Sequence, residues 1–413
     1  MAKIKPFKAI RPCREYAYKV AALPYDSISY KEALKVVKNN EYSFLHVDRA
    51  EIDLDQSINP YDNAVYEKAR ENLDKIISNG VLFEEDSECM YVYRQIMNGR
   101  VQTGLVTCTS IDDYINDNIK KHENTREEKE KDRFNHIEHC SAHTGPIFMA
   151  YKNNDTISEV IERETKNKPE YEFTTKDGVT QIVWVINDPE TTSHLTQLFG
   201  GVNSLYIADG HHRAASAVKV GLKCRKEDPN YTGKEEFNYF MSVLFQASEL
   251  MISEYDRVIN GIDGIIKDEF LEQTKMNFDI LPCDKNVEFK PVEKHTFGMF
   301  LEGEWYKLKA KEGTFNNNDP VLKLDVSILQ NNMLSKVLGI NNPRTDERID
   351  FVGGIKGIED LQKSEEDAFQ IAFSMYPTSI DELIKIADCG LLMPPKSTFF
   401  EPKLLSGLFI HRF

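Results

Sequence analysis

The sequence predicts a mixed α/β protein of the α+β class, in which strands and helices follow one another without a regular repeat. Apolar runs of strand length lie between charged segments with a helical period, and no internal repeat is visible. The 413 residues give room for roughly two to three domains. We expect an N-terminal α/β segment (1–110), a core (111–260), and a C-terminal α/β segment (261–413) that packs on the core.

Composition and charge narrow the class of partner. Hydrophobic residues make up 41% of the chain and charged residues 29%, as in ordinary globular proteins. The net charge of -16 makes nucleic acid an unlikely partner. No stretch approaches a membrane span or the apolar part of a signal peptide, and the seven cysteines are scattered. We therefore expect a cytoplasmic protein with no membrane partner, while its oligomeric state stays open.

The first segment predicts two helices and a hairpin. One helix begins near Ser29, and a second covers residues 63–79. Residues 89–97 and 100–111 are expected to form strands that are joined through Asn98-Gly99. This dipeptide is the strongest short hairpin signal, because both residues tolerate the positive φ angles of a tight turn.

The middle of the chain predicts a long helix followed by alternating strands and helices. Residues 112–140 are charged and periodic, and we expect them to form one helix. Strands are expected at 180–188 and 204–209, on either side of a short helix that contains His194 and Leu195. A helix over 214–222, a surface loop over 224–236 and a strand over 239–246 follow, and residues 324–338 are expected to be helical.

The stretch ADGHHR, residues 208–213, is the first candidate site. An apolar strand ends at Asp209 and a helix follows, so Gly210 is free to take a backbone angle that other residues avoid. Exposed amides at a helix start, together with Arg213 and the imidazoles of His211 and His212, suit a phosphate group. The aspartate indicates a general base or a magnesium ligand. The alternative is an ordinary helix cap with solvated side chains.

A second candidate is the stretch KKHENTREEKEKDR, residues 120–133. On one helix, His122, Arg126, Lys129 and Arg133 would form a single cationic stripe, with carboxylates such as Glu123 beside it. Such a stripe can bind a polyphosphate or its metal ion. A solvated helix whose charges pair with one another is the alternative.

Two further stretches leave their roles open. His136, His139, Cys140 and His143 have a spacing that could place metal ligands on one helical face, and whether they bind a metal stays undecided. Lys396, Ser397 and Thr398 lie in a proline-stiffened loop. Their ammonium and hydroxyl groups could coordinate phosphate, or they could simply form a turn.

Seven stretches, in order along almost the whole chain, resemble the bacterial and archaeal domain of unknown function family 1015. They are KPFKAIRP, PYDSIS, SFLHVDRAEIDL, KKHENTREEKEKDR, TGPIF, YIADGHHRAASA and MPPKSTFFEPKLLSGL. Several of these motifs are rare, and their recurrence in the same order makes the resemblance specific. It implies kinship and leaves the activity to be inferred from the site.

The ADGHHR stretch is in turn similar to the phosphate-binding motif of the ParB and sulfiredoxin superfamily, to which a free serine kinase belongs. This resemblance implies a ParB/sulfiredoxin-like core, nucleotide phosphates bound at a helix start, and a link to serine metabolism. It implies catalytic or phosphate-binding roles for Asp209, His211, His212 and Arg213. It makes His122, Glu123, Arg126 and Arg133 further candidates.

These residues together predict a phosphotransferase that moves a phosphoryl group between a nucleotide or pyrophosphate and a small hydroxy compound such as serine. ATP, ADP or pyrophosphate is the expected co-substrate, with Mg²⁺. Expected catalytic residues are Asp209, His211 and His212. Expected phosphate- and nucleotide-binding residues are Gly210, Arg213, His122, Glu123, Arg126, Lys129, Arg133, Lys396, Ser397 and Thr398. Alternatives are a phosphatase acting on a small phosphoester such as phosphoserine, and a non-enzymatic, ParB-like nucleotide-binding regulator.

Overall fold

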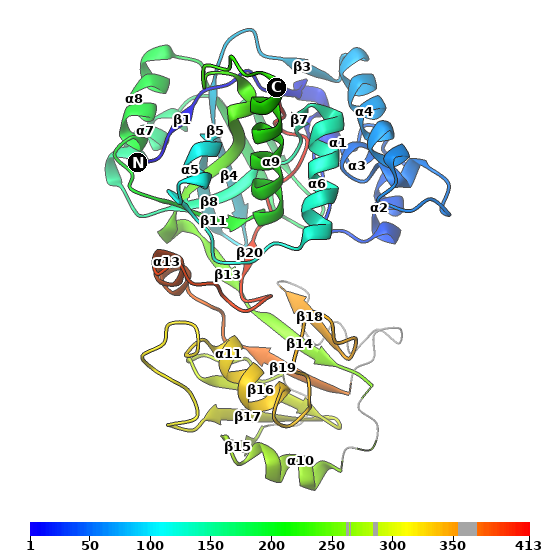
Figure 1. The fold of residues 1–413 in the computed structure, drawn as a ribbon, viewed down its shortest axis with the longest axis vertical. Coiled ribbons are helices and arrows are strands. Elements are labelled where there is room, and N and C mark those ends of the chain that lie inside the picture. Colours follow the sequence, from blue (N-terminus) through cyan, green and yellow to red (C-terminus); the bar gives the residue numbers. More distant parts are fainter. Residues whose placement is uncertain (262–263, 265, 284–287, 354–369) are drawn as a thin grey trace. The chain divides into compact units, whose positions relative to one another are not determined.

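The computed structural model describes residues 1–261, 264, 266–283, 288–353 and 370–413. These residues form mixed α/β structure, which confirms the expected class, and they divide into two compact units (Figure 1). Unit 1 comprises Met1–Lys121, Thr125–Leu250 and Pro402–Phe413, and unit 2 comprises His122–Asn124 and Met251–Glu401. The segment borders expected at 110 and 260, and the ParB/sulfiredoxin-like label, stay predictions.

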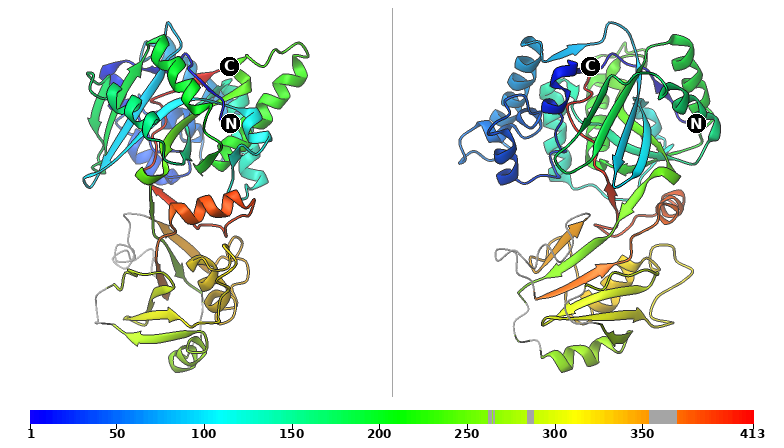
Figure 2. Two further views of the ribbon diagram at one scale, coloured as in Figure 1. Left: turned by 90° about the vertical axis from the view of Figure 1, so that its left-hand side faces the viewer. Right: turned by 180° about the vertical axis from the view of Figure 1, so that it is seen from behind.

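A nine-stranded mixed sheet forms the centre of unit 1. Eight strands lie in the order β6 (Ile119–Lys120), β11 (Leu205–Asp209), β8 (Ile147–Tyr151), β12 (Tyr239–Gln246), β5 (Arg100–Ser110), β4 (Met90–Met97), β10 (Thr180–Ile186) and β9 (Tyr171–Thr174). The ninth strand, β1 (Ile4–Lys5), pairs with β5. The β6–β11 and β8–β12 pairs are parallel, and the other neighbours are antiparallel. The right-hand view of Figure 2 shows these strands from behind.

The hairpin at Asn98-Gly99 is confirmed. β4 and β5 pair antiparallel with Met97 opposite Arg100, so the turn consists of two residues. Both take positive φ angles, 52° at Asn98 and 78° at Gly99. That combination matches the twist of the adjoining strands and explains why this dipeptide signals a hairpin.

The N-terminal helices of unit 1 build a second core beside the sheet. These helices are α1 (Ala17–Val20), α2 (Tyr30–Val37), α3 (Leu45–Asp48) and α4 (Asn63–Ser78), with a short ladder between β2 (Ile10–Pro12) and β3 (Leu82–Glu84). The expected helix start at Ser29 is confirmed by a capping box, in which Ser29 accepts the Glu32 N–H and Glu32 accepts the Ser29 N–H. The buried side chains include Phe44, Leu45 and Leu73.

The single long helix expected over residues 112–140 is wrong. The structure has α5 (Ile111–Ile115), then strand β6, then α6 (Glu127–Cys140). Asp117 takes a φ of 57°, which ends the helical path, and Ile119 pairs with Leu205 of β11 and is fully buried. A long-range strand pairing thus outweighs the local helical pattern. Residues 122–126 lie before α6, so the expected cationic stripe does not form on one helix.

Three further helices complete unit 1: α7 (Asp155–Glu164), α8 (Pro189–Phe199) and α9 (His211–Glu227). α6 and α9 pack against each other, and Figure 1 shows both in front of the sheet. The main core contains side chains from sheet and helices, among them Leu105, Ile207, Leu244 and Ala217. Because α9 continues to Glu227, the loop expected from residue 224 begins only at 228.

Unit 2 contains a six-stranded antiparallel sheet. Its order is β15 (Phe278–Pro282), β17 (Glu304–Ala310), β16 (Thr296–Leu301), β19 (Ile371–Met375), β14 (Tyr255–Ile259) and β18 (Ile349–Gly353). Its other elements are α10 (Lys267–Thr274), α11 (Asp325–Leu329) with a π-helical turn over Gln330–Leu334, α13 (Ile380–Asp388), and the pair β13 (Met251–Ser253) and β20 (Phe399–Glu401). The helix expected over 324–338 is therefore shorter. Among the described residues, no helix combines the length and the apolar character that a membrane span requires.

Candidate functional site in unit 1

The ADGHHR stretch joins the end of strand β11 to the start of helix α9. The β8–β11 pairing shifts its register between Ile207 and Asp209, so the strand is irregular where it ends. Gly210 takes a φ of 95°, which a residue with a side chain rarely adopts, and α9 begins at His211. The turn expected here is thus confirmed, and the helix begins at His211, earlier than the expected start at Ala214. The first N–H groups of such a helix have no partner within the helix and attract anions.

Arg213 lies in a narrow space between two glycines. A Cβ atom at Gly210 would stand 3.1 Å from its Nη2 and 3.2 Å from its Cζ, and one at Gly145 would stand 3.4 Å from its Nη1. The Nη1 donates a hydrogen bond to the carbonyl of Pro146. The Nε is buried and makes no hydrogen bond to any of the described residues. Both glycines therefore leave room for a guanidinium group that keeps one donor available for a ligand.

A small pocket borders this arginine. Its cavity volume is about 20 Å³, which is room for one or two water molecules. It is lined by Pro24, Tyr25, Asp48, Arg133, His136, Ile137, His143, Thr144, Gly145, Ile147, Arg213, Met241 and Ser406. A space of this size accepts the reacting end of a ligand and not a whole nucleotide.

A second arginine, Arg133 of α6, lines the same pocket. Its Nε donates to the carboxylate of Asp132 over 2.9 Å, and its guanidinium carbon lies 3.9 Å from the centre of the Tyr25 ring. Burial alone would lower the pKa of Arg133, but Asp132 and Tyr25 raise it above its ordinary value. Burial raises the pKa of the Tyr25 hydroxyl. Arg133 is therefore a permanent cation whose charge is partly balanced by its neighbour.

Asp209 is ionised and already paired. Its carboxylate accepts the N–H of Gly210 over 2.7 Å and the ammonium of Lys403 over 3.1 Å. Burial favours the neutral acid, but Lys403 and Arg213 overcome this and hold the pKa of Asp209 below its ordinary range. A carboxylate with so low a pKa is a weak proton acceptor. This pairing weakens the general-base role that the sequence indicates for Asp209.

The two histidines of the motif occupy different environments. His211 is buried at the first position of α9. The Nε2 of His212 accepts the backbone N–H of Arg126 over 3.0 Å. Burial and the guanidinium of Arg126 lower the pKa of His212, so its ring is neutral at pH 7 with the proton on Nδ1. The ring of His212 thus fixes the loop before α6 against the start of α9.

The predicted cations of the 122–133 stretch that belong to unit 1 are Arg126, Lys129 and Arg133, and their polar groups have different partners. Arg126 is the N-cap residue of α6, and the Lys129 ammonium donates to the Tyr61 hydroxyl over 2.9 Å. Of these, only Arg133 lines the pocket. Phosphate-binding roles for Arg126 and Lys129 stay predictions.

The other predicted residues belong to unit 2. The His122 ring lies 3.2 Å from the Thr398 hydroxyl, and its carbonyl accepts the N–H of Met393 over 2.8 Å. The Ser397 hydroxyl donates to the carbonyl of Pro394 over 2.6 Å. The Lys396 ammonium lies 5.3 Å from the centre of the Tyr255 ring. The structure thus gathers His122 and the loop that contains Lys396, Ser397 and Thr398, and the neighbouring residue Glu123 belongs to the same unit.

The histidines and the cysteine with metal-ligand spacing have other partners. His136 Nε2 lies 3.1 Å from the Val47 carbonyl, and His139 contacts Asn63 and the backbone of Asn135. Burial raises the pKa of Cys140 to about 12, so it is a neutral thiol. His143 lies beyond the end of α6, on the short strand β7 (Ala142–His143). Within the described part of the chain, these four side chains are not gathered around one point.

Sequence reasoning missed several residues that the structure places at this site. They are Asp48 and, behind His143, His411 and Glu236. The sequence singles out His143 only as a possible metal ligand, and it offers Tyr25 and Lys403 only through the motifs PYDSIS and MPPKSTFFEPKLLSGL. His411 and Glu236 lie in no motif, and only the fold brings them to His143.

Comparison with solved structures finds distant likeness. A mutant free serine kinase in complex with AMP is 14% identical over 71% of this chain and 87% of that chain, with a TM-score of 0.38. A conserved hypothetical protein from Pyrococcus furiosus is 14% identical over 74% and 94%, with a TM-score of 0.37. SbnI from Staphylococcus aureus with a C-terminal truncation is 11% identical over 73% and 85%, at a TM-score of 0.37. At these TM-scores nothing is concluded from the likeness.

Comparison of the sequence is more decisive about kinship. No curated protein matches it. The family model described as protein of unknown function (DUF1015) matches residues 4–327, which is most of the chain and includes the ADGHHR stretch and Arg133. The expectation from the seven sequence stretches is thereby confirmed, and the chain belongs to the DUF1015 family.

Proposed function

We propose that unit 1 binds a phosphoryl group at the start of α9 and transfers it between a nucleotide or pyrophosphate and a small hydroxy compound. One observation carries the proposal: the buried Nε of Arg213 makes no hydrogen bond to the described residues, beside a pocket that Arg133 also lines. Two guanidinium groups and a helix start offer donors and positive potential to phosphate oxygens. Stabilisation of that kind accounts for most of the catalysis of phosphoryl transfer.

The size of the pocket supports a small acceptor. A volume of about 20 Å³ takes one hydroxyl or carboxylate group, so the reacting end of the acceptor would enter while the donor stays outside. Serine and phosphoserine form the acceptor pair that we would test first. ATP, ADP or pyrophosphate would be the donor.

The proposal includes Mg²⁺ because the phosphates of the phosphoryl donor would bind it. Mg²⁺ is commonly held by one or two carboxylates together with substrate phosphates. Since the Asp209 carboxylate is already paired with the Lys403 ammonium, we expect phosphate oxygens to be most of the Mg²⁺ ligands at the start of α9. His211, His212 and Asp209 would then position the turn and the phosphate. In unit 2, phosphate binding by His122, Glu123, Lys396, Ser397 and Thr398 stays a prediction from the sequence and is not part of this proposal.

The ionised and paired carboxylate of Asp209 favours a second candidate function, nucleotide binding without catalysis. A carboxylate that is paired with Lys403 and has a lowered pKa suits anion binding better than proton transfer. A nucleotide-binding regulator without turnover would need only such a site. A phosphatase would use the same site with water in the pocket as the acceptor.

The test is a turnover assay on the purified chain. Serine or phosphoserine is incubated with Mg²⁺ and ATP, ADP or pyrophosphate, and phosphorus is followed by ³¹P NMR. We expect phosphoryl exchange in at least one pairing, and its loss in Arg213→Gln. The matched control is Arg163→Gln, which removes an exposed arginine of the same unit outside the pocket. Binding without turnover in every pairing would replace the transferase with the regulator.

A further inference from the structure

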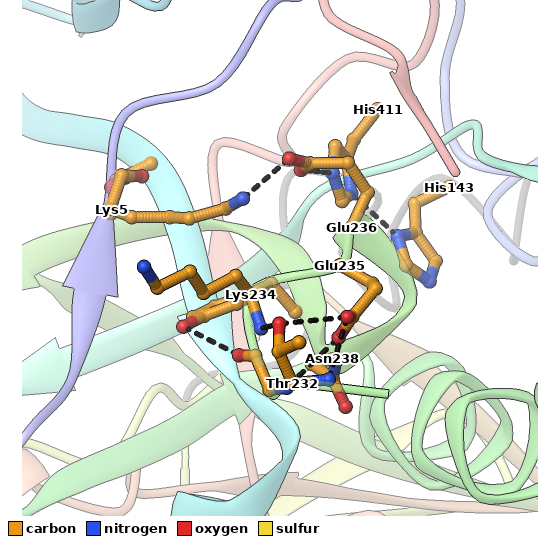
Figure 3. Close-up of polar contacts among 11 residues, drawn as sticks. Lys5, His143, Thr232, Lys234, Glu235, Glu236, Asn238 and His411 are labelled. Carbon is orange, nitrogen blue, oxygen red and sulfur yellow. Dashed lines mark hydrogen bonds and ion pairs between the residues drawn. The ribbon is translucent and has the colours of Figure 1, made fainter. Parts of the chain in front are cut away.

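The C-terminal strand of unit 1 brings two buried histidines together. β21 (His411–Arg412) pairs antiparallel with β7 (Ala142–His143), and the register places His411 opposite His143. Their Nδ1 atoms are 3.1 Å apart. Figure 3 shows the two rings, with Glu236 and Lys5 on the far side of His411.

The hydrogen bonds determine where the protons of the two rings lie. Oε1 of the Glu236 carboxylate accepts a hydrogen bond from the Lys5 ammonium, and Oε2 lies 2.7 Å from His411 Nε2. Burial would raise the pKa of Glu236, but His411 and Lys5 lower it, so the carboxylate is ionised and only accepts. His411 Nε2 therefore carries a hydrogen.

The protonation of His411 in turn determines which nitrogen of His143 carries the hydrogen. Burial lowers the pKa of both His411 and His143, so both rings are neutral at pH 7. A neutral His411 with its hydrogen on Nε2 has a bare Nδ1, so the Nδ1 of His143 carries the hydrogen between the rings. His143 Nε2 is then left with a lone pair.

That lone pair belongs to a residue of the pocket. His143 lines the pocket with Arg213, and its buried Nε2 makes no hydrogen bond to the described residues. A buried acceptor without a partner is uncommon and calls for a ligand or a water. The titratable or charged side chains that also line the pocket are Tyr25, Asp48, Arg133, His136 and Arg213.

We propose that His143 Nε2 is the proton acceptor of the reaction in this pocket, with His411 and Glu236 as its positioning residues. This inference rests on the proposed function, and it assigns the base to a lone pair that makes no hydrogen bond to the described residues, whereas the Asp209 carboxylate is already paired with Lys403. The acceptor O–H bond breaks as Nε2–H forms, the oxygen bonds to phosphorus, and the bond from phosphorus to the donor oxygen breaks. The donor leaves with its electron pair, as nucleotide or phosphate.

The relay accommodates the charge that forms on His143. When Nε2 takes a proton, the Nδ1 proton can pass to His411 Nδ1. The positive charge then lies beside the Glu236 carboxylate. A carboxylate that orients one histidine is the arrangement of the serine-protease triad, and here a second histidine extends it.

Turnover of three variants tests the role of His143. We expect His143→Gln to lower kcat about 100-fold or more, as for the loss of a general base. Glu236→Gln should lower kcat about 10-fold and move the acidic limb of the pH profile to lower pH, a shift that a merely structural role would not produce. The matched control is His139→Gln, which removes a histidine outside the pocket and should leave kcat unchanged.

Histidine NMR keeps the inference independent of folding defects in these variants. In the ¹⁵N-histidine-labelled wild type, we expect His143 with its hydrogen on Nδ1 and His411 with its hydrogen on Nε2. Hydrogen on Nε2 of His143 would overturn the inference, and so would wild-type turnover that survives His143→Gln. No turnover by the wild type in any pairing would instead overturn the proposed function, and this inference with it.

Discussion

At the start of α9 in unit 1, Arg213 has a buried Nε that makes no hydrogen bond to the described residues. In the loop at 394–398 of unit 2, by contrast, several polar groups make hydrogen bonds to neighbouring residues. There Ser397 donates to Pro394, its carbonyl accepts from the Thr378 hydroxyl over 2.9 Å, and the Lys396 carbonyl accepts from Arg257 over 3.0 Å. Both stretches contain residue types suited to phosphate. The difference teaches that available donors can differ between stretches of similar residue types, and it leads us to expect phosphate binding at the start of α9 and not at this loop.

The largest effect should follow from removing the available donor. Arg213→Gln takes away a charge-assisted hydrogen bond, worth about 1.5–3 kcal/mol. Since about 1.4 kcal/mol corresponds to a factor of ten, pyrophosphate affinity should fall about 10- to 100-fold in calorimetry. Arg163→Gln should change it little. Equal losses in both variants would mean that only net charge matters and would break the comparison.

The next effect separates backbone strain from crowding of the guanidinium. Gly210→Ala and Gly178→Ala both place a side chain at positive φ, 95° and 84°, which should cost each about 1–2 kcal/mol of unfolding free energy. Only at Gly210 would the new Cβ meet Arg213, because nothing lies within 4 Å at Gly178. Denaturant unfolding should therefore give similar losses, while pyrophosphate affinity falls only in Gly210→Ala.

A smaller effect concerns the pair of Asp209 and Lys403. The pKa of Asp209 is lowered in the folded protein, so its contribution to stability is present above the unfolded pKa of about 4 and is lost as pH falls through the folded value. Lys403→Met should reduce that pH dependence. With 31% of the Asp209 side chain exposed, we expect a loss of about 1 kcal/mol at pH 7. Urea unfolding at pH 7 and pH 3 measures it, and an unchanged acid limb would contradict the pairing.

The smallest effect should come from unit 2. Lys396→Gln leaves the backbone hydrogen bonds of its loop in place, and we expect pyrophosphate affinity to change less than twofold in the same calorimetry. A tenfold loss would show instead that this loop binds phosphate, as its residue types suggest, and would reverse the comparison.

Local signals in the sequence predict much of the fold. The hairpin at Asn98-Gly99, the helix start at Ser29 and the turn before α9 each depend on a few adjacent residues, and each is confirmed. The break between α5 and α6 depends on Ile119 pairing with Leu205, 86 residues away, so the continuous charge pattern could not reveal it.

In the candidate site, too, the features set by adjacent residues are predictable and those set by distant residues are not. The ADGHHR stretch is local, so the sequence predicts the strand end, the glycine turn and Arg213 together. The contact of His143 with His411 joins residues 268 positions apart, and Glu236 reaches them from a third segment. No spacing along the chain signals such a group. The pairing of Asp209 with Lys403, 194 residues away, likewise appears only in the folded chain.

The most direct test of the central claim is an NMR titration of the arginine side chains with pyrophosphate. The Nε–H signal of Arg213 is identified by its absence in Arg213→Gln. We predict that this signal shifts and saturates with pyrophosphate, while that of Arg133, whose Nε is bound to Asp132, moves less. A signal that stays in place while pyrophosphate binds, or the absence of binding, would contradict a phosphoryl site at the start of α9.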